Sequence, residues 1–118
     1  MKNVIHLHKI FYRLATFSLY SDSTQKDTSE TANPANLALV SSAPASNTAI
    51  VIADYAIANW GSVRFATDIL LTTFSATSAY HDFALNSSGI ANISKTGISK
   101  FGIRASSDID RDRSQKCV

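Results

Sequence analysis

The chain of 118 residues contains little cysteine, little glycine and few charged side chains. Its single cysteine, Cys117, excludes an intrachain disulfide and a metal site built from cysteines. The four glycines are scattered at positions 61, 89, 97 and 102, so no glycine-rich loop can cradle a phosphate. No apolar run approaches the roughly 18 residues that a membrane-spanning helix needs. We therefore expect no membrane span and no cofactor.

Charge is also too sparse and too evenly balanced to indicate a charged partner. Charged residues make up 17%, against the usual share of about one quarter, and the net charge is +2. The basic residues form no stripe, which argues against nucleic-acid binding. Serine, threonine, alanine and asparagine take the place of charged residues, and they favour solvated strand faces and turns.

Short segments with strand-like patterns recur along the chain. Residues 14–20 alternate, with Ala15, Phe17 and Leu19 on one face and polar residues or Tyr20 on the other. Further strands are predicted at 37–41, 62–71, 80–85 and 98–104. In the strand at 62–71, Val63, Phe65 and Ile69 are expected to point inward.

Two segments suggest short helical turns. Residues 45–59 fit a strand or one to two turns of helix, with Ser46 or Asn47 as the N-cap, and the pattern leaves both open. Residues 90–93 fit one helical turn, and Asn86 suits a turn or N-cap before it.

The aromatic residues divide into two groups. The phenylalanines at 17, 65, 83 and 101 are expected in the core, whereas Tyr20, Tyr55, Trp60 and Tyr80 are expected at its boundary. Gly102, inside a strand, predicts a bulge or a neighbour packed closely against it. One shared interior should receive six side chains: Phe17, Leu19, Phe83, Leu85, Phe101 and Ile103.

These patterns predict an all-β, jelly-roll-like antiparallel sandwich with one or two short helical turns. Residues 14–110 would form the module, residues 1–13 a poorly matching N-terminal segment, and residues 111–118 a polar tail.

The chain resembles a known group of modules, most clearly in its closing half. The matching segments are YHDFALNSSGIANI at 80–93, TGISKFGIR at 96–104, the serine and aspartate at 107–108, and more loosely ATFSLY at 15–20, with 53–55 and 60–61. They resemble jelly-roll modules of DNRLRE type from large bacterial, archaeal or phage surface proteins, which are similar in shape to carbohydrate-binding modules. The resemblance implies an extracellular, cell-surface or virion location and neighbouring domains of a larger protein. It covers about residues 14–110 and is more specific for fold than for function.

The match has departures at both ends. Similar modules would have an apolar strand before Leu14 and further strands after Asp108, whereas residues 110–118 alternate acid and base and have no apolar face. We therefore expect a fragment of a longer protein, with an incomplete sheet whose uncovered edge favours self-association.

Candidate chemical sites are few. His6 and His8 would share a strand face, but no third metal ligand is evident nearby. The aspartates at 108, 110 and 112 lack the glycine and glutamate of a calcium loop. No strained-turn serine motif indicates a nucleophile, and His81 and Asp82 alternate to opposite faces. We expect no enzyme.

The sequence therefore predicts a non-catalytic structural or adhesive module, with carbohydrate binding as the alternative. Trp60 and Tyr55 would then bind a polysaccharide by stacking on sugar rings. The resemblance to these modules also implies a structural ion pair, for which Arg104 and Asp108 are the candidates.

Overall fold

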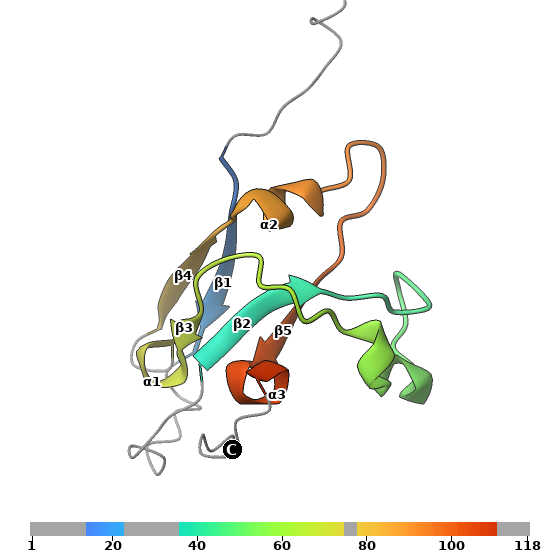
Figure 1. The fold of residues 1–118 in the computed structure, drawn as a ribbon, viewed down its shortest axis with the longest axis horizontal. Helices are drawn as coiled ribbons and strands as arrows, with labels where there is room; N and C mark the ends of the chain where they lie inside the picture. The colour runs from blue at the N-terminus through green and yellow to red at the C-terminus, as the bar shows by residue number, and fades with distance from the viewer. Residues whose placement is uncertain (1–13, 23–35, 75–77, 111–118) are drawn as a thin grey trace, which may run out of the picture.

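The structure is a computed structural model that describes residues 14–22, 36–74 and 78–110. Five strands form two antiparallel sheets, and short helical segments lie between them (Figure 1). The strands are β1 (Thr16–Ser21), β2 (Asn36–Ser41), β3 (Ile69–Leu70), β4 (Ala79–Ala84) and β5 (Phe101–Ala105). The helical segments are η3 (Ile52–Tyr55), η4 (Ile57–Asn59), α1 (Leu71–Phe74), α2 (Ser87–Ala91) and α3 (Ser106–Asp110).

The first sheet is the pair β1–β4, with Phe17 opposite Phe83 and Tyr20 opposite Tyr80. Burial alternates along both strands, so the period-two pattern expected for residues 14–20 and 80–85 is confirmed. Phe17 and Phe83 point to the core. The rings of Tyr20 and Tyr80 meet edge to face on the outer side, 5.2 Å apart between centroids, and both stay largely exposed.

The second sheet has the order β3-β2-β5, and β2 is its central strand. Three consecutive residues of β2, Ala38, Leu39 and Val40, have no exposed surface. A strand covered on both faces carries an unbroken apolar run, and this run distinguishes β2 from the alternating β1. Leu39 joins the core between the sheets, whereas Val40 pairs with Gly102 of β5.

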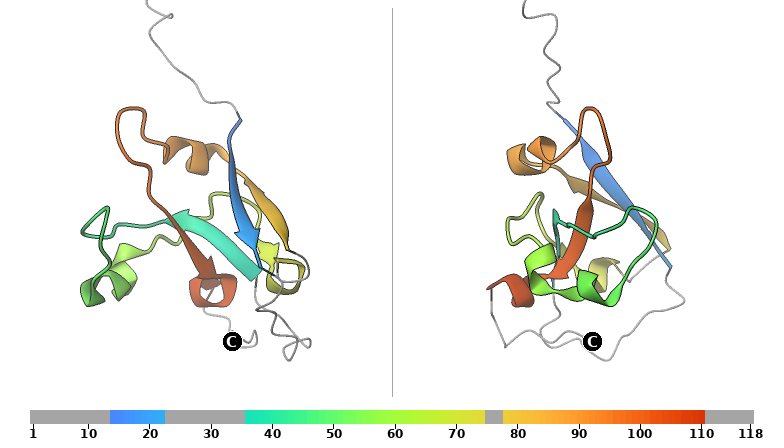
Figure 2. Two further views of the ribbon diagram at one scale, coloured as in Figure 1. Left: turned by 180° about the vertical axis from the view of Figure 1, so that it is seen from behind. Right: turned by 90° about the vertical axis from the view of Figure 1, so that its right-hand side faces the viewer.

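The core lies between the two sheets and is built on aromatic contacts. The ring of Phe17 lies 5.2 Å from that of Phe101 and 6.5 Å from that of Phe83, while Phe65 meets Phe101 edge to face at 6.0 Å. All six side chains predicted to share one interior belong to this cluster, so that prediction is confirmed. Figure 2 shows the β1–β4 pair beside β2 and β5 from two further directions.

The expected helical turn after Asn86 is also confirmed, as α2. Asn86 is its N-cap, because its side-chain oxygen accepts a hydrogen bond from the Gly89 N–H at 3.0 Å. A Cβ at Gly89 would lie 2.7 Å from the carbonyl oxygen of Phe65, so this position needs a glycine for close packing.

The prediction of a strand at 62–71 is wrong for most of these residues. Only Ile69–Leu70 is a strand, and Val63 is 59% exposed instead of inward, although Phe65 is buried as expected. The Phe65 N–H donates to the Leu39 carbonyl at 2.8 Å, but Arg64 then pairs with Asp68 four residues on. At this local ion pair the backbone bends, and it does not continue as a strand hydrogen-bonded to β2.

The described residues confirm a strand-rich fold of two antiparallel sheets but do not confirm a jelly-roll topology, since neither of these sheets closes. A jelly roll needs about eight strands, and here residues 43–59 make no strand. They fold into a lobe, which contains η3 and η4 and projects away from both sheets (green in Figures 1 and 2). Of the two alternatives for 45–59, the helical one is correct. Val51 precedes η3, so neither Ser46 nor Asn47 is its N-cap.

Candidate functional site

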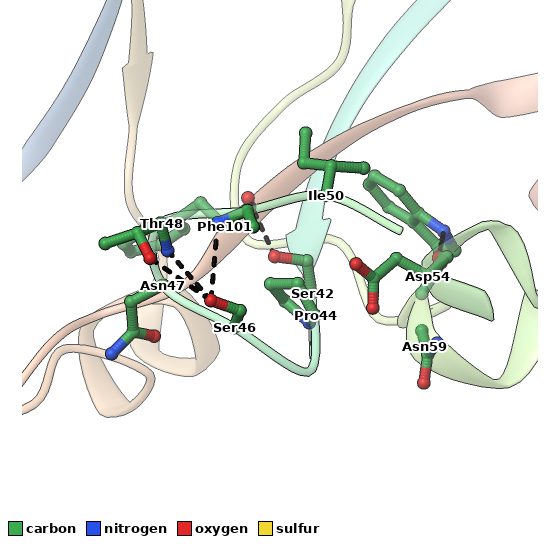
Figure 3. Close-up of a pocket in the computed structure, with 11 residues that line it drawn as sticks. Ser42, Pro44, Ser46, Asn47, Thr48, Ile50, Asp54, Asn59 and Phe101 are labelled. Carbon is green, nitrogen blue, oxygen red and sulfur yellow. Dashed lines mark hydrogen bonds between the residues drawn. The ribbon is translucent and has the colours of Figure 1, made fainter. Parts of the chain in front are cut away.

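An open hollow of about 410 Å³ lies where the 43–59 lobe meets the sheet. Figure 3 shows its walls, which come from the end of β2, the lobe and the start of β5. The lining residues are Ser42, Pro44, Ser46, Asn47, Thr48, Ala49, Ile50, Asp54, Asn59, Trp60 and Phe101. Apart from Asp54, none of them is charged.

Asp54 anchors the lobe and is only 6% exposed. Its two carboxylate oxygens accept hydrogen bonds from the Ala45 and Val51 N–H groups, each at 2.9 Å. These backbone hydrogen bonds, first Val51 and then Ala45, lower the pKa of Asp54 below its ordinary value, and the positive charge of Lys100 adds to the effect. The carboxylate is thus held charged and occupied by the backbone.

Trp60 forms one wall of the hollow, and three contacts position it. Its backbone bridges antiparallel to Ser42, which continues the line of β2, and its indole N–H donates to the Asp54 carbonyl at 3.1 Å. A Cβ at Gly102 would lie 2.5 Å from Cζ3 of Trp60, so the indole lies directly on the glycine. The close neighbour predicted for Gly102 is therefore present.

The structure separates the two aromatic residues proposed for sugar binding. Trp60 lines the hollow, whereas Tyr55 does not and is 75% exposed on the lobe. The two residues are five apart in the sequence. Because η3 and η4 turn the backbone between them, their rings lie in different surroundings.

Arg104 and Asp108 lie together, outside the hollow. Nε and Nη2 of Arg104 donate to one Asp108 oxygen at 2.9 and 2.5 Å, and Nη1 donates to the Gly61 carbonyl at 2.7 Å. The Arg104 side chain is 10% exposed. This arrangement joins β5, α3 and the segment that follows Trp60.

Sequence reasoning missed a second arginine cluster. Arg64 donates two hydrogen bonds to Asp110, at 3.0 and 2.7 Å, and its Nε donates to Asp68 at 3.0 and 3.1 Å. These two carboxylates, Asp110 more than Asp68, raise the pKa of Arg64 above its ordinary value. The i,i+4 spacing of Arg64 and Asp68 could have indicated the local pair, but no spacing indicates Asp110.

A serine–histidine contact was also missed. Ser21 Oγ lies 2.9 Å from His81 Nε2, at the end of the β1–β4 pair, and the His81 ring lies against Phe74 at 4.8 Å. Ser21 is only 5% exposed, so its hydroxyl is poorly placed to attack a substrate. Asp82 points to the opposite face and bonds Ser18.

Other candidates from the sequence fall elsewhere. His6, His8, Asp112 and Cys117 lie outside the described residues. Within residues 14–22, 36–74 and 78–110, no three histidine, cysteine or acidic side chains gather as metal ligands would. The helices in these ranges are all too short or too polar to cross a bilayer.

Comparison of the chain with protein-family models, curated proteins and solved structures gives no match. The hollow beside Trp60 must therefore be interpreted from its own chemistry. Its free surface offers an indole, a phenyl ring, hydroxyls and amides, which suit a neutral polar ligand with an apolar face.

Proposed function

We propose that the protein is a non-catalytic structural or adhesive β-sandwich module of a secreted, cell-surface or virion-associated protein. The observation that carries the proposal is the hollow, which is open and built of neutral groups around one sequestered carboxylate. Such a hollow can hold a ligand, but a hydrolytic site of the two-carboxylate kind needs a second acid. The resemblance to DNRLRE-type surface modules supports the same proposal.

Carbohydrate binding is the second candidate, and Trp60 favours it. A pyranose ring has an apolar face that can stack on the indole, and its hydroxyls can exchange hydrogen bonds with Asn47 and Thr48, which are exposed at the rim. Tyr55 supports this candidate less well, because it lies outside the hollow.

Pull-down on insoluble polysaccharides, together with a glycan array, tests the binding role. Gly102→Ala introduces a methyl group where the indole of Trp60 now lies, so we expect it to displace the ring, shift the emission of the only tryptophan and weaken glycan binding. Gly97→Ala is the matched control, since its nearest neighbour would be 3.4 Å away and no effect is expected.

Two further variants keep the test informative if Gly102→Ala fails to fold. Asn47→Ala, at an exposed position of the hollow, should weaken glycan binding several-fold, about 0.5–1.5 kcal/mol for one lost hydrogen bond. Tyr55→Ala should bind as the wild type does. Equal loss in both variants would reject the hollow as the sugar site. Sugars released from any polysaccharide during the incubation would overturn the non-catalytic role.

A further inference from the structure

The 43–59 lobe exposes large apolar side chains to an unusual degree. Ile52 is 90% exposed, Ile50 79%, Tyr55 75% and Ile57 64%. Most other residues of the lobe are small, and they include alanines at 43, 45, 49, 53, 56 and 58. Exposed apolar side chains that are this concentrated mark a contact surface.

The outer surface of the lobe carries no charge. Asp54 is its one charged residue, and the carboxylate is turned inward onto the Ala45 and Val51 N–H groups. Lys100, outside the lobe, directs its amine to the Pro44 carbonyl at 3.2 Å. A surface meant for water can carry charges freely, whereas a surface that enters hydrocarbon cannot, because charged groups are expensive there.

The size and shape of the lobe favour a lipid partner over a protein partner. A stable protein interface takes about 20–30 residues on each side, arranged in a complementary patch. The lobe has fewer residues and projects beyond the sheets (Figures 1 and 2). A projecting apolar tip needs no matching shape in a fluid lipid layer, and a tyrosine suits the headgroup boundary.

From these features we infer that the 43–59 lobe inserts into a lipid surface, with Ile52, Tyr55 and Ile57 entering the boundary between headgroups and acyl chains. None of these three residues lines the hollow, so this role goes beyond the proposed function and does not depend on glycan binding. The adhesive partner of this surface would be the lipid itself.

Flotation of the full chain with vesicles tests the inference. The vesicles are phosphatidylcholine alone and phosphatidylcholine mixed with phosphatidylglycerol. We expect binding to both kinds that persists in high salt, because the lobe is uncharged and apolar burial is not screened. The double variant Ile52→Ser with Ile57→Ser should bind more than about tenfold more weakly.

Ile98→Ser is the matched control, since Ile98 is 64% exposed but lies outside the lobe. It should bind as the wild type does, and thermal melts should show that all variants stay folded. The inference is overturned by absent wild-type binding, by binding to anionic vesicles alone that high salt removes, or by equal loss in Ile98→Ser. Sedimentation showing a dimer that the double variant dissociates, without vesicle binding, would assign the lobe to a second copy and also overturn it. Glycan binding by the double variant should be unchanged, so either proposal can fail alone.

Discussion

Asp54 shows how one side chain can organise a segment that has no regular strand or long helix. Its carboxylate accepts hydrogen bonds from the N–H groups of two earlier residues of the lobe, Ala45 and Val51, and its carbonyl accepts one from the indole N–H of Trp60. A buried N–H without a partner is costly, so the charged carboxylate satisfies donors that the irregular backbone leaves open. No motif in the sequence indicated this role. The role depends on hydrogen bonds from backbone N–H groups, and since nearly every residue type has such a group, no sequence pattern marks the donors.

The lowered pKa of Asp54 predicts a pH dependence of stability. Since the folded-state pKa lies below its ordinary value of 3.8, the unfolded chain binds the proton more tightly, and the contribution of Asp54 is present in full above that value. It is lost as the pH falls through the lower, folded-state pKa. Melting temperatures between neutral pH and strong acid should show a smaller acid-induced decrease in Asp54→Asn than in the wild type.

Asp54→Asn should also be less stable than the wild type at neutral pH. The wild-type carboxylate has two acceptor oxygens, one for each backbone N–H, whereas the asparagine amide has only one. One backbone donor therefore loses its partner. Identical acid profiles for the two proteins would show that Asp54 does not titrate as the geometry implies.

At the scale of elements, two arginines attach α3 to the rest of the fold, one from β5 and one from the segment before β3. Arg104 of β5 bonds Asp108 and the Gly61 carbonyl, and Arg64 bonds Asp110. The pairing of Arg104 with Asp108 was an expectation taken from similar modules, and the two residues do lie within hydrogen-bond distance. Only the tertiary arrangement decides that Ser106–Asp110 is a helix and that Arg64 reaches it.

Arg104→Lys should destabilise the fold by about 1–3 kcal/mol, because a lysine amine cannot reach the Gly61 carbonyl and Asp108 in the same forked geometry. The control is Arg64→Lys, whose side chain is more exposed, at 32%, and which should cost about 0.5–1 kcal/mol. Urea unfolding measures both. A larger loss for Arg64→Lys would contradict the ranking.

At the scale of the whole molecule, one aromatic cluster joins the two sheets. Phe17 belongs to the β1–β4 pair, yet its ring lies closer to Phe101 of the second sheet than to Phe83 of its own. The two sheets share no strand and no ladder, so their mutual placement depends on this packing.

Phe17→Ala should therefore cost toward the lower end of about 3–5 kcal/mol, since Phe17 is partly and not fully buried. Tyr20→Ala, on the same strand but the outer face, removes one aromatic pair and should cost about 0.5–1.5 kcal/mol. Denaturant titration of both variants checks the difference. Equal losses would mean that the phenylalanine cluster does not hold the sheets together.

The sequence by itself determined which side chains are buried wherever the backbone alternates in regular strands. Phe17, Leu19, Phe83 and Leu85 could be assigned to the core because period-two burial is a local property of the chain. Asn86 could be assigned as a cap because capping joins residues three apart.

Only the tertiary structure decided the features that join distant segments. The bend after Phe65, the packing of Trp60 on Gly102 and the attachment of α3 all depend on partners that lie far away along the chain. Residues 62–71 alternate as a strand would, but a ladder also needs a neighbouring strand that continues beside them. Local pattern specifies which face of a segment is apolar, whereas the partners available in the folded chain decide whether the backbone stays extended.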